Sequence, residues 1–174
     1  MGLKVPKFLG VILFGFGLSA NFSKAQQMPE FEVLSNRVVE FVSSPFGGTW
    51  RTTDPSKYQG VVLLLKISFT PEIKEIVTSD FTLTYKSKTD IQKAVCMAVT
   101  IPPSTLPPAS EEEGIWITND LPKGEAFSLA VGNMKCCTLY SRFFFAPLPN
   151  DVNEVTLLYK DKMVAKTIGI KRGK

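Results

Sequence analysis

Three cysteines are the side chains with the greatest potential reactivity in this 174-residue sequence, which contains no histidine. Catalysis through a serine–histidine or cysteine–histidine pair and metal binding through imidazole are therefore excluded. Adjacent cysteines such as Cys136 and Cys137 can bind a soft metal or form a strained disulfide. Neighbouring side chains on a strand point in opposite directions, so these two thiols would not easily converge on one metal ion or on each other. A cysteine-based redox or metal protein is an alternative hypothesis, and we predict no cofactor and no metal site.

The face that each cysteine occupies predicts at most one disulfide. If the segment 136–145 is a strand, Cys137 lies on its apolar face and Cys136 on the opposite face. Around Cys96 the apolar face would be formed by Val95, Met97, Val99 and Ile101, which leaves Cys96 on the other face. We therefore expect a Cys96–Cys136 bridge with Cys137 as a buried thiol. A Cys96–Cys137 bridge and the absence of any structural bridge remain open.

A second set of candidate residues is aromatic or cationic. The segment 43–59 contains two glycines and two prolines, a composition that predicts a loop. Aromatic side chains and a cation on a loop can bind a sugar, a peptide or a lipid headgroup, or the rings can fold inward and cap one end of the protein. The candidate contact residues are Phe46, Trp50, Arg51, Tyr58 and Trp116.

Carboxylate chemistry finds less support in the sequence. Glu111, Glu112 and Glu113 end a segment, 102–113, with four prolines, which is typical of an extended and solvated connection. No EF-hand spacing accompanies them, so a solvated acidic tip is expected in place of a calcium site. A glycosidase would need two carboxyl groups about 5 to 9.5 Å apart across a cleft, and no pair stands out. A carboxylate-based secreted hydrolase is a further alternative.

These residues would be positioned by short β-strands. Every second residue from Val61 to Phe69 is apolar, and Phe81, Leu83 and Tyr85 repeat the alternation. Helical periodicity is weak throughout, with at most one turn in 72–79. The sequence thus predicts an all-β, immunoglobulin-like antiparallel β-sandwich of about 7–9 strands, with two sheets facing each other. Further strands are expected at 31–43, 91–101, 114–118, 125–131, 137–145, 154–160 and 163–171.

The first 25 residues have the pattern of a secretory signal peptide. Lys4 and Lys7 precede an apolar run at 8–20, which is too short to span a bilayer comfortably, and cleavage is expected after Ala25. Removing this segment takes away three of the 20 basic residues and no acidic one, which leaves 17 basic against 16 acidic residues. Composition therefore gives no reason to expect nucleic-acid binding. We expect a mobile lead-in at 26–30 and a single domain at 31–174.

Two parts of the chain resemble a known family. The segment from Lys57 to Ile67, KYQGVVLLLKI, leads into Ser79–Leu83, and the segment Phe145–Pro149 is followed by Val155–Tyr159. In these parts, roughly 57–85 and 139–170, the chain resembles small exported immunoglobulin-like domains of the DUF4352 family. The resemblance implies an extracytoplasmic module without known chemistry and transfers no catalytic residue.

The signal pattern, the strand pattern and the lack of histidine together predict a non-catalytic module that is periplasmic, cell-surface or secreted. Its partner would be a protein or a component of the cell envelope, and after cleavage it would not span a membrane. Contact would be made through end loops or through a sheet edge, where unpaired backbone groups can accept an added strand. Binding of a hydrophobic ligand inside the sandwich is a weaker hypothesis.

Overall fold

The computed structural model describes residues 28–44, 48–51, 54–88, 90–101, 103–108, 115–118, 127–132 and 137–170. The predicted signal segment 1–25 lies outside these ranges. Of the predicted lead-in, Met28 packs against the main core and the first strand begins at Glu30. The strands are β1 (Glu30–Val39), β2 (Phe41–Ser44), β3 (Gly48–Arg51), β4 (Tyr58–Ser68), β5 (Glu75–Val77), β6 (Phe81–Lys86), β7 (Ile91–Ile101), β8 (Ile115–Thr118), β9 (Ser128–Ala130), β10 (Thr138–Pro149), β11 (Glu154–Tyr159) and β12 (Lys162–Gly169).

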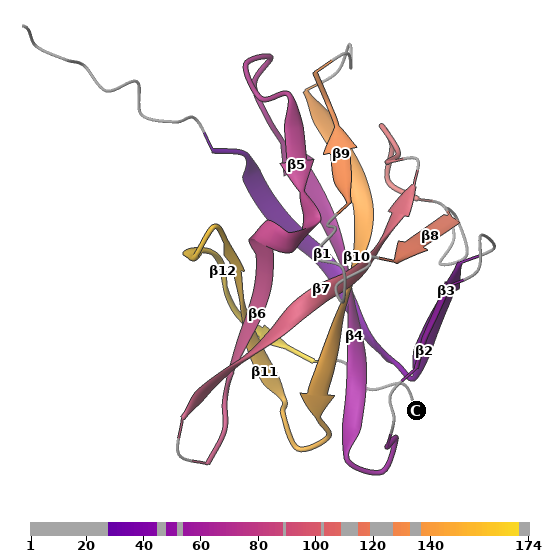
Figure 1. Ribbon diagram of the computed structural model, residues 1–174. Helices are drawn as coiled ribbons and strands as arrows, with labels where there is room; N and C mark the ends of the chain where they lie inside the picture. The colour runs from indigo at the N-terminus through magenta and orange to yellow at the C-terminus, as the bar shows by residue number, and fades with distance from the viewer. Residues whose placement is uncertain are drawn as a thin grey trace, which may run out of the picture.

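Eight of these strands form one antiparallel sheet. Their order is β1-β4-β10-β7-β6-β11-β12, with β8 paired to β7 beside this path. The sheet is strongly curled, so that β1 from one end of the order comes into contact with β12 from the other (Figure 1). The all-β class and the sandwich-like fold are thus confirmed. The layers arise from one curled sheet and two small two-stranded sheets, where the sequence predicted two facing sheets.

The inner face of the curled sheet carries the main core. The predicted alternation in β4 and β6 is confirmed, because Val61, Leu63, Leu65, Ile67, Phe69, Phe81 and Leu83 are all buried. Aromatic rings join distant strands across this interior. The ring of Phe81 lies 4.6 Å from that of Phe143 and 4.9 Å from that of Tyr159, and Phe31 of β1 lies 4.8 Å from Tyr159. These contacts hold β1 against β11 without any backbone pairing between the two strands.

A smaller second core lies on the outer face of the sheet. Its buried residues are Val42, Val62, Ala98, Phe144 and Ala146, and Trp116 of β8 packs against them. The hairpin β2–β3 therefore covers the outer face of β4 and β10, whereas the sequence predicted a loop over most of this segment. Phe143, Phe144 and Phe145 are fully buried because β10 faces a core on both sides, as predicted for a central strand.

A β-bulge in β7 changes which side chains face the main core. Phe144 pairs with Ala98 and Phe145 pairs with Cys96, so Met97 is an extra residue in β7. Ala94 and Cys96 face the main core before the bulge, and Val99 faces it afterwards. The prediction that Val95 and Met97 share one apolar face with Val99 was therefore wrong: Val95 is exposed.

The segment 72–79, for which at most one helical turn was expected, contributes strand β5 and the start of a single 3-10 turn at Thr78–Asp80. Strand β5 pairs with β9, and this small sheet places Ile76 and Leu129 on the main core. Thr78 is fully buried and donates hydrogen bonds from its N–H and its hydroxyl to Phe127 O. Within the described ranges no helix has the length and hydrophobicity needed to cross a membrane.

Candidate functional site

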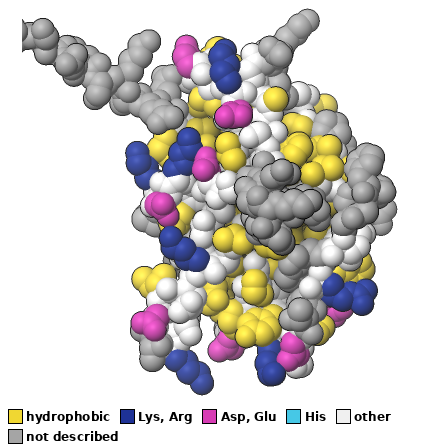
Figure 2. Space-filling view, in the orientation of Figure 1, with side chains coloured by type: hydrophobic (Ala, Val, Ile, Leu, Met, Phe, Trp, Pro, Cys, Tyr) yellow, Lys and Arg dark blue, Asp and Glu magenta, His cyan; other side chains and the backbone are white. Residues whose placement is uncertain are grey.

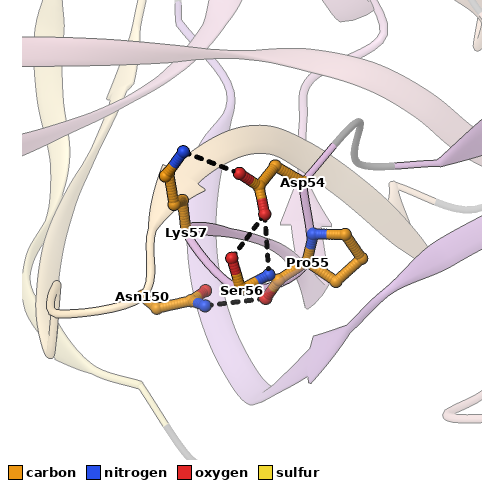
Figure 3. Close-up of polar contacts among 5 residues, drawn as sticks. All are labelled: Asp54, Pro55, Ser56, Lys57 and Asn150. Atoms are coloured by element: carbon orange, nitrogen blue, oxygen red, sulfur yellow. Dashed lines mark hydrogen bonds and ion pairs between the residues drawn. The ribbon is translucent and has the colours of Figure 1, made fainter.

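The turn that leads into β4 is fixed by its own side chains (Figure 3). The Asp54 carboxylate accepts hydrogen bonds from the N–H of Ser56, at 3.1 Å, and from the Ser56 hydroxyl, and it pairs with Lys57 Nζ at 2.9 Å. These hydrogen bonds from Ser56 and Lys57 lower the pKa of Asp54. Asp54 is consequently ionised at neutral pH, and it compensates the positive charge of Lys57.

This turn is also attached to the corner that follows β10. Asn150 Nδ2 donates to Pro55 O at 2.8 Å, and the N–H of Asn150 donates to Lys57 O at 2.9 Å. From β4, Gln59 Nε2 donates to Pro149 O and to Val152 O, both at 3.3 Å. The prolines and the hydrogen bonds make the turn and the corner one rigid unit at this end of the molecule.

A groove of about 330 Å³ opens beside this unit. We call it the end groove; it is lined by Val38, Val39, Glu40, Pro55, Tyr58, Gln59 and Asn150. Val39 pairs with Gly60, and this register brings Glu40 alongside the start of β4. Tyr58 is 39% exposed, whereas Gln59 is only 6% exposed.

Exposed groups continue from the groove onto the hairpin β2–β3. Phe41 follows Glu40 directly and is 48% exposed, and the guanidinium of Arg51, its partner in the hairpin, lies 5.5 Å from the centre of its ring. We call the end groove together with Phe41 and Arg51 the end surface. Figure 2 shows hydrophobic side chains at the lower end of the molecule, flanked by charged side chains of both signs.

Asp151 also belongs to this end of the molecule. The pKa of Tyr85 is raised chiefly by burial, and interactions with Tyr58 and Asp151 add to the rise. Asp151 is exposed and follows Asn150, a residue of the groove. The end surface is therefore adjacent to a second carboxylate besides that of Glu40.

The structure brings together two of the five predicted contact residues, Arg51 and Tyr58, on the end surface. Trp116 lies elsewhere, on β8, where its half-buried ring packs at 6.5 Å from that of Phe144. Phe46 and the side chain of Trp50 lie outside the described part of the structure. Sequence reasoning missed Glu40, Phe41 and Gln59, because the first two were assigned to a strand and the third has no chemical signature. The polar Glu40 inside an apolar strand pattern was the available signal.

The cysteines differ from the predicted arrangement. Cys96 is a fully buried thiol whose Sγ donates to Ala98 O, and burial raises its pKa to about 12. Cys96 is thus a free thiol and does not form the predicted Cys96–Cys136 disulfide. Cys136 lies outside the described residues. Cys137 was expected to be buried, but it is exposed because it precedes the first residue of β10.

The described residues were also expected to lack a metal site. The described ranges contain no group of three or more His, Cys, Asp or Glu side chains that could hold a metal ion, and Glu111–Glu113 lie outside them.

A buried polar cluster joins β7 and β10. There Ser141 Oγ donates to Thr100 O at 2.8 Å, and Thr100 Oγ1 accepts the N–H of Arg142 at 2.9 Å. These bonds continue the strand pairing beyond its last ladder pair, Phe143 with Val99, and indicate a structural role.

No family model matches the sequence, and no curated protein or solved structure matches it either. The resemblance to the DUF4352 family stays a prediction.

Proposed function

We propose that this protein is an exported, non-catalytic β-sandwich module that binds a protein or a cell-envelope component through its end surface. The observation that carries the proposal is the placing of exposed rings, Phe41 of β2 and Tyr58 of β4, and of exposed charges beside a rigid turn. Rings that are held in place lose little conformational entropy on binding, and they bury a large apolar area. The signal-like pattern of residues 1–25 supports the extracytoplasmic location.

The end surface is favoured over a sheet edge as the binding route. The strands at the two ends of the main strand order are irregular: β1 has a register shift between Val33 and Ser35, and the pairing of β11 with β12 shifts twice between Val155 and Leu158. Bulges interrupt the regular row of backbone donors and acceptors that an added strand would need. β1 and β12 also contact each other, which narrows access to both edges.

A capture experiment tests the proposal. The protein lacking residues 1–25 is immobilised and incubated with the surface fraction of its source cells. The test variant is Phe41→Ser/Tyr58→Ser, and the matched control is Leu106→Ser, since Leu106 is an exposed apolar residue outside the end surface (71% exposed). We expect the parent and the control to retain the same species, with a loss of about tenfold or more in the test variant, as for residues at the centre of an interface.

Circular dichroism confirms that the variants are folded, so that a loss reports on binding. A species retained equally by all three proteins contradicts the end-surface proposal and directs attention to the sheet edges. Retention of no species by the parent protein contradicts the binding function itself.

A further inference from the structure

The end groove contains hydrogen-bond acceptors that nothing in the described structure satisfies. Gln59 is more than nine-tenths buried and uses Nε2 for Pro149 O and Val152 O, and its Oε1 accepts no hydrogen bond from another described residue. The carboxylate of Glu40 forms no ion pair with any residue in the described ranges, and the same is true of Asp151 beside the groove. No fully buried side-chain oxygen or nitrogen of the described residues lacks a hydrogen-bond partner, so Gln59 Oε1 is open to solvent and can accept a hydrogen bond from a ligand that brings a donor.

The donors and cations around the groove are, by contrast, already engaged. Asn150 Nδ2 donates to Pro55 O, and Lys57 is paired with Asp54 at 2.9 Å. The guanidinium of Arg51 lies over the ring of Phe41. Among the described residues, an anionic ligand would therefore meet uncompensated carboxylates and no unoccupied cation, and a sugar would find acceptors for its hydroxyl groups but few donors.

The rest of the groove is apolar or aromatic. Val38, Val39 and Pro55 offer aliphatic surface, and Tyr58 offers part of an aromatic ring. A side chain with a methylene stem and a cationic head matches this lining, because the stem can pack on aliphatic surface while the head meets carboxylate, amide oxygen and ring face.

We infer that the end groove accepts an arginine or lysine side chain from an exposed segment of a partner protein. Glu40 supplies the charge, Gln59 Oε1 accepts a hydrogen bond, and Tyr58 contacts the cationic head through its ring. This inference rests on the proposed function and names the chemistry of its partner.

A direct titration tests the inference with a defined probe. The probe is a ten-residue Gly/Ser peptide with one central arginine, and the matched peptide has citrulline there, which keeps the shape and removes the charge. Amide shifts of the isotope-labelled protein report the site. We expect shifts at Glu40, Gln59 and Asn150 with a dissociation constant on the order of millimolar, as befits one side chain. The citrulline peptide should bind more weakly, and 0.5 M salt should weaken the arginine peptide only.

Two protein variants complete the test. Glu40→Gln should weaken the arginine peptide about three- to fivefold, the range expected for losing one exposed charge pair. Glu75→Gln is the matched control, because Glu75 is an exposed carboxylate on β5, away from the end groove, and it should leave the affinity unchanged (Figure 1). Equal binding of both peptides, shifts confined to another surface, or no effect of Glu40→Gln would each overturn the inference.

A further experiment tests whether the chain's own basic segment occupies the end groove. Lys171, Arg172 and Lys174 follow Ile170, whose N–H donates to Asn153 O at 2.8 Å, close to Asn150. If the arginine peptide binds only a chain ending at Ile170, the occupant is this segment, and the assignment to a partner is overturned. If the arginine peptide does not bind but capture of the partner is still lost in Phe41→Ser/Tyr58→Ser, only the inference about the groove is overturned. If the arginine peptide binds but Phe41→Ser/Tyr58→Ser captures its partner as well as the parent does, the proposed function is overturned.

Discussion

Gly60 lies in β4 against the ring of Phe144, the largest side chain of the second core. A Cβ atom at Gly60 would lie 2.6 Å from Phe144 Cζ and closer still to Phe144 Cε2. Phe144 is fully buried between the sheet and its outer covering, so its ring has little room to move away. Glycine is therefore required here by a close approach, two residues from Tyr58 of the end surface.

Gly60→Ala is expected to lower the free energy of unfolding by about 1–3 kcal/mol, because the added methyl group overpacks the second core. Urea unfolding measures the change. Gly169→Ala in β12 is the matched control, because no atom lies within 4 Å of its added Cβ, and it should change stability by less than about 0.5 kcal/mol. Equal stabilities of the two variants would show that the Phe144 ring can yield.

At the scale of elements, the turn of the hairpin β11–β12 uses residues that do not suit its backbone. Lys160 and Asp161 have φ angles of 50° and 59°, both in the left-handed region, as a type I′ turn requires. Neither residue is the asparagine or glycine that this turn prefers. The exposed ion pairs of Lys160 with Asp80, at 3.7 Å, and of Asp161 with Lys93, at 3.2 Å, compensate only in part, since exposed pairs contribute little.

The double substitution Lys160→Asn/Asp161→Gly should stabilise the protein by about 1 kcal/mol, because the left-handed backbone then costs less. Thermal and urea unfolding measure the gain. The control is Lys160→Ala/Asp161→Ala, which removes the same ion pairs and keeps the unfavourable conformation, so it should be less stable than the parent. An asparagine–glycine variant no better than the double-alanine variant would mean that the ion pairs dominate.

At the scale of the whole molecule, the curled sheet encloses two protonated acids that ionise more easily once the chain unfolds. Burial raises the pKa of Cys96 from 9.0 to about 12 and that of Tyr159 from 10.0 to about 12. Above pH 9 the unfolded chain loses these protons while the folded chain keeps them. The unfolded state then binds fewer protons, so the free energy of unfolding must fall as the pH rises from about 9 to about 12.

Unfolding in urea at pH 8, 9, 10 and 11 should show this fall, with up to about 1.4 kcal/mol per pH unit from Cys96. Cys96→Ala should be less stable than the parent at pH 8, because it leaves a cavity, but its stability should fall less steeply above pH 9. Tyr159→Phe should flatten the curve above pH 10. Parallel curves for the parent and Cys96→Ala would contradict the burial of the thiol.

The sequence by itself determined the all-β class, the strands β4 and β6 and the central place of β10, since a period of two and a run of three phenylalanines depend only on local order. Only the tertiary structure decided that one sheet curls on itself, that the bulge at Met97 places Cys96 and Val99 on the same core-facing side of β7, and that Cys137 is exposed. The end groove also belongs to this second group. Glu40, Tyr58 and Asn150 are far apart in the sequence, and strand register and a hydrogen-bonded corner bring them together. Such long-range pairings leave no periodic signal in the residues that make them.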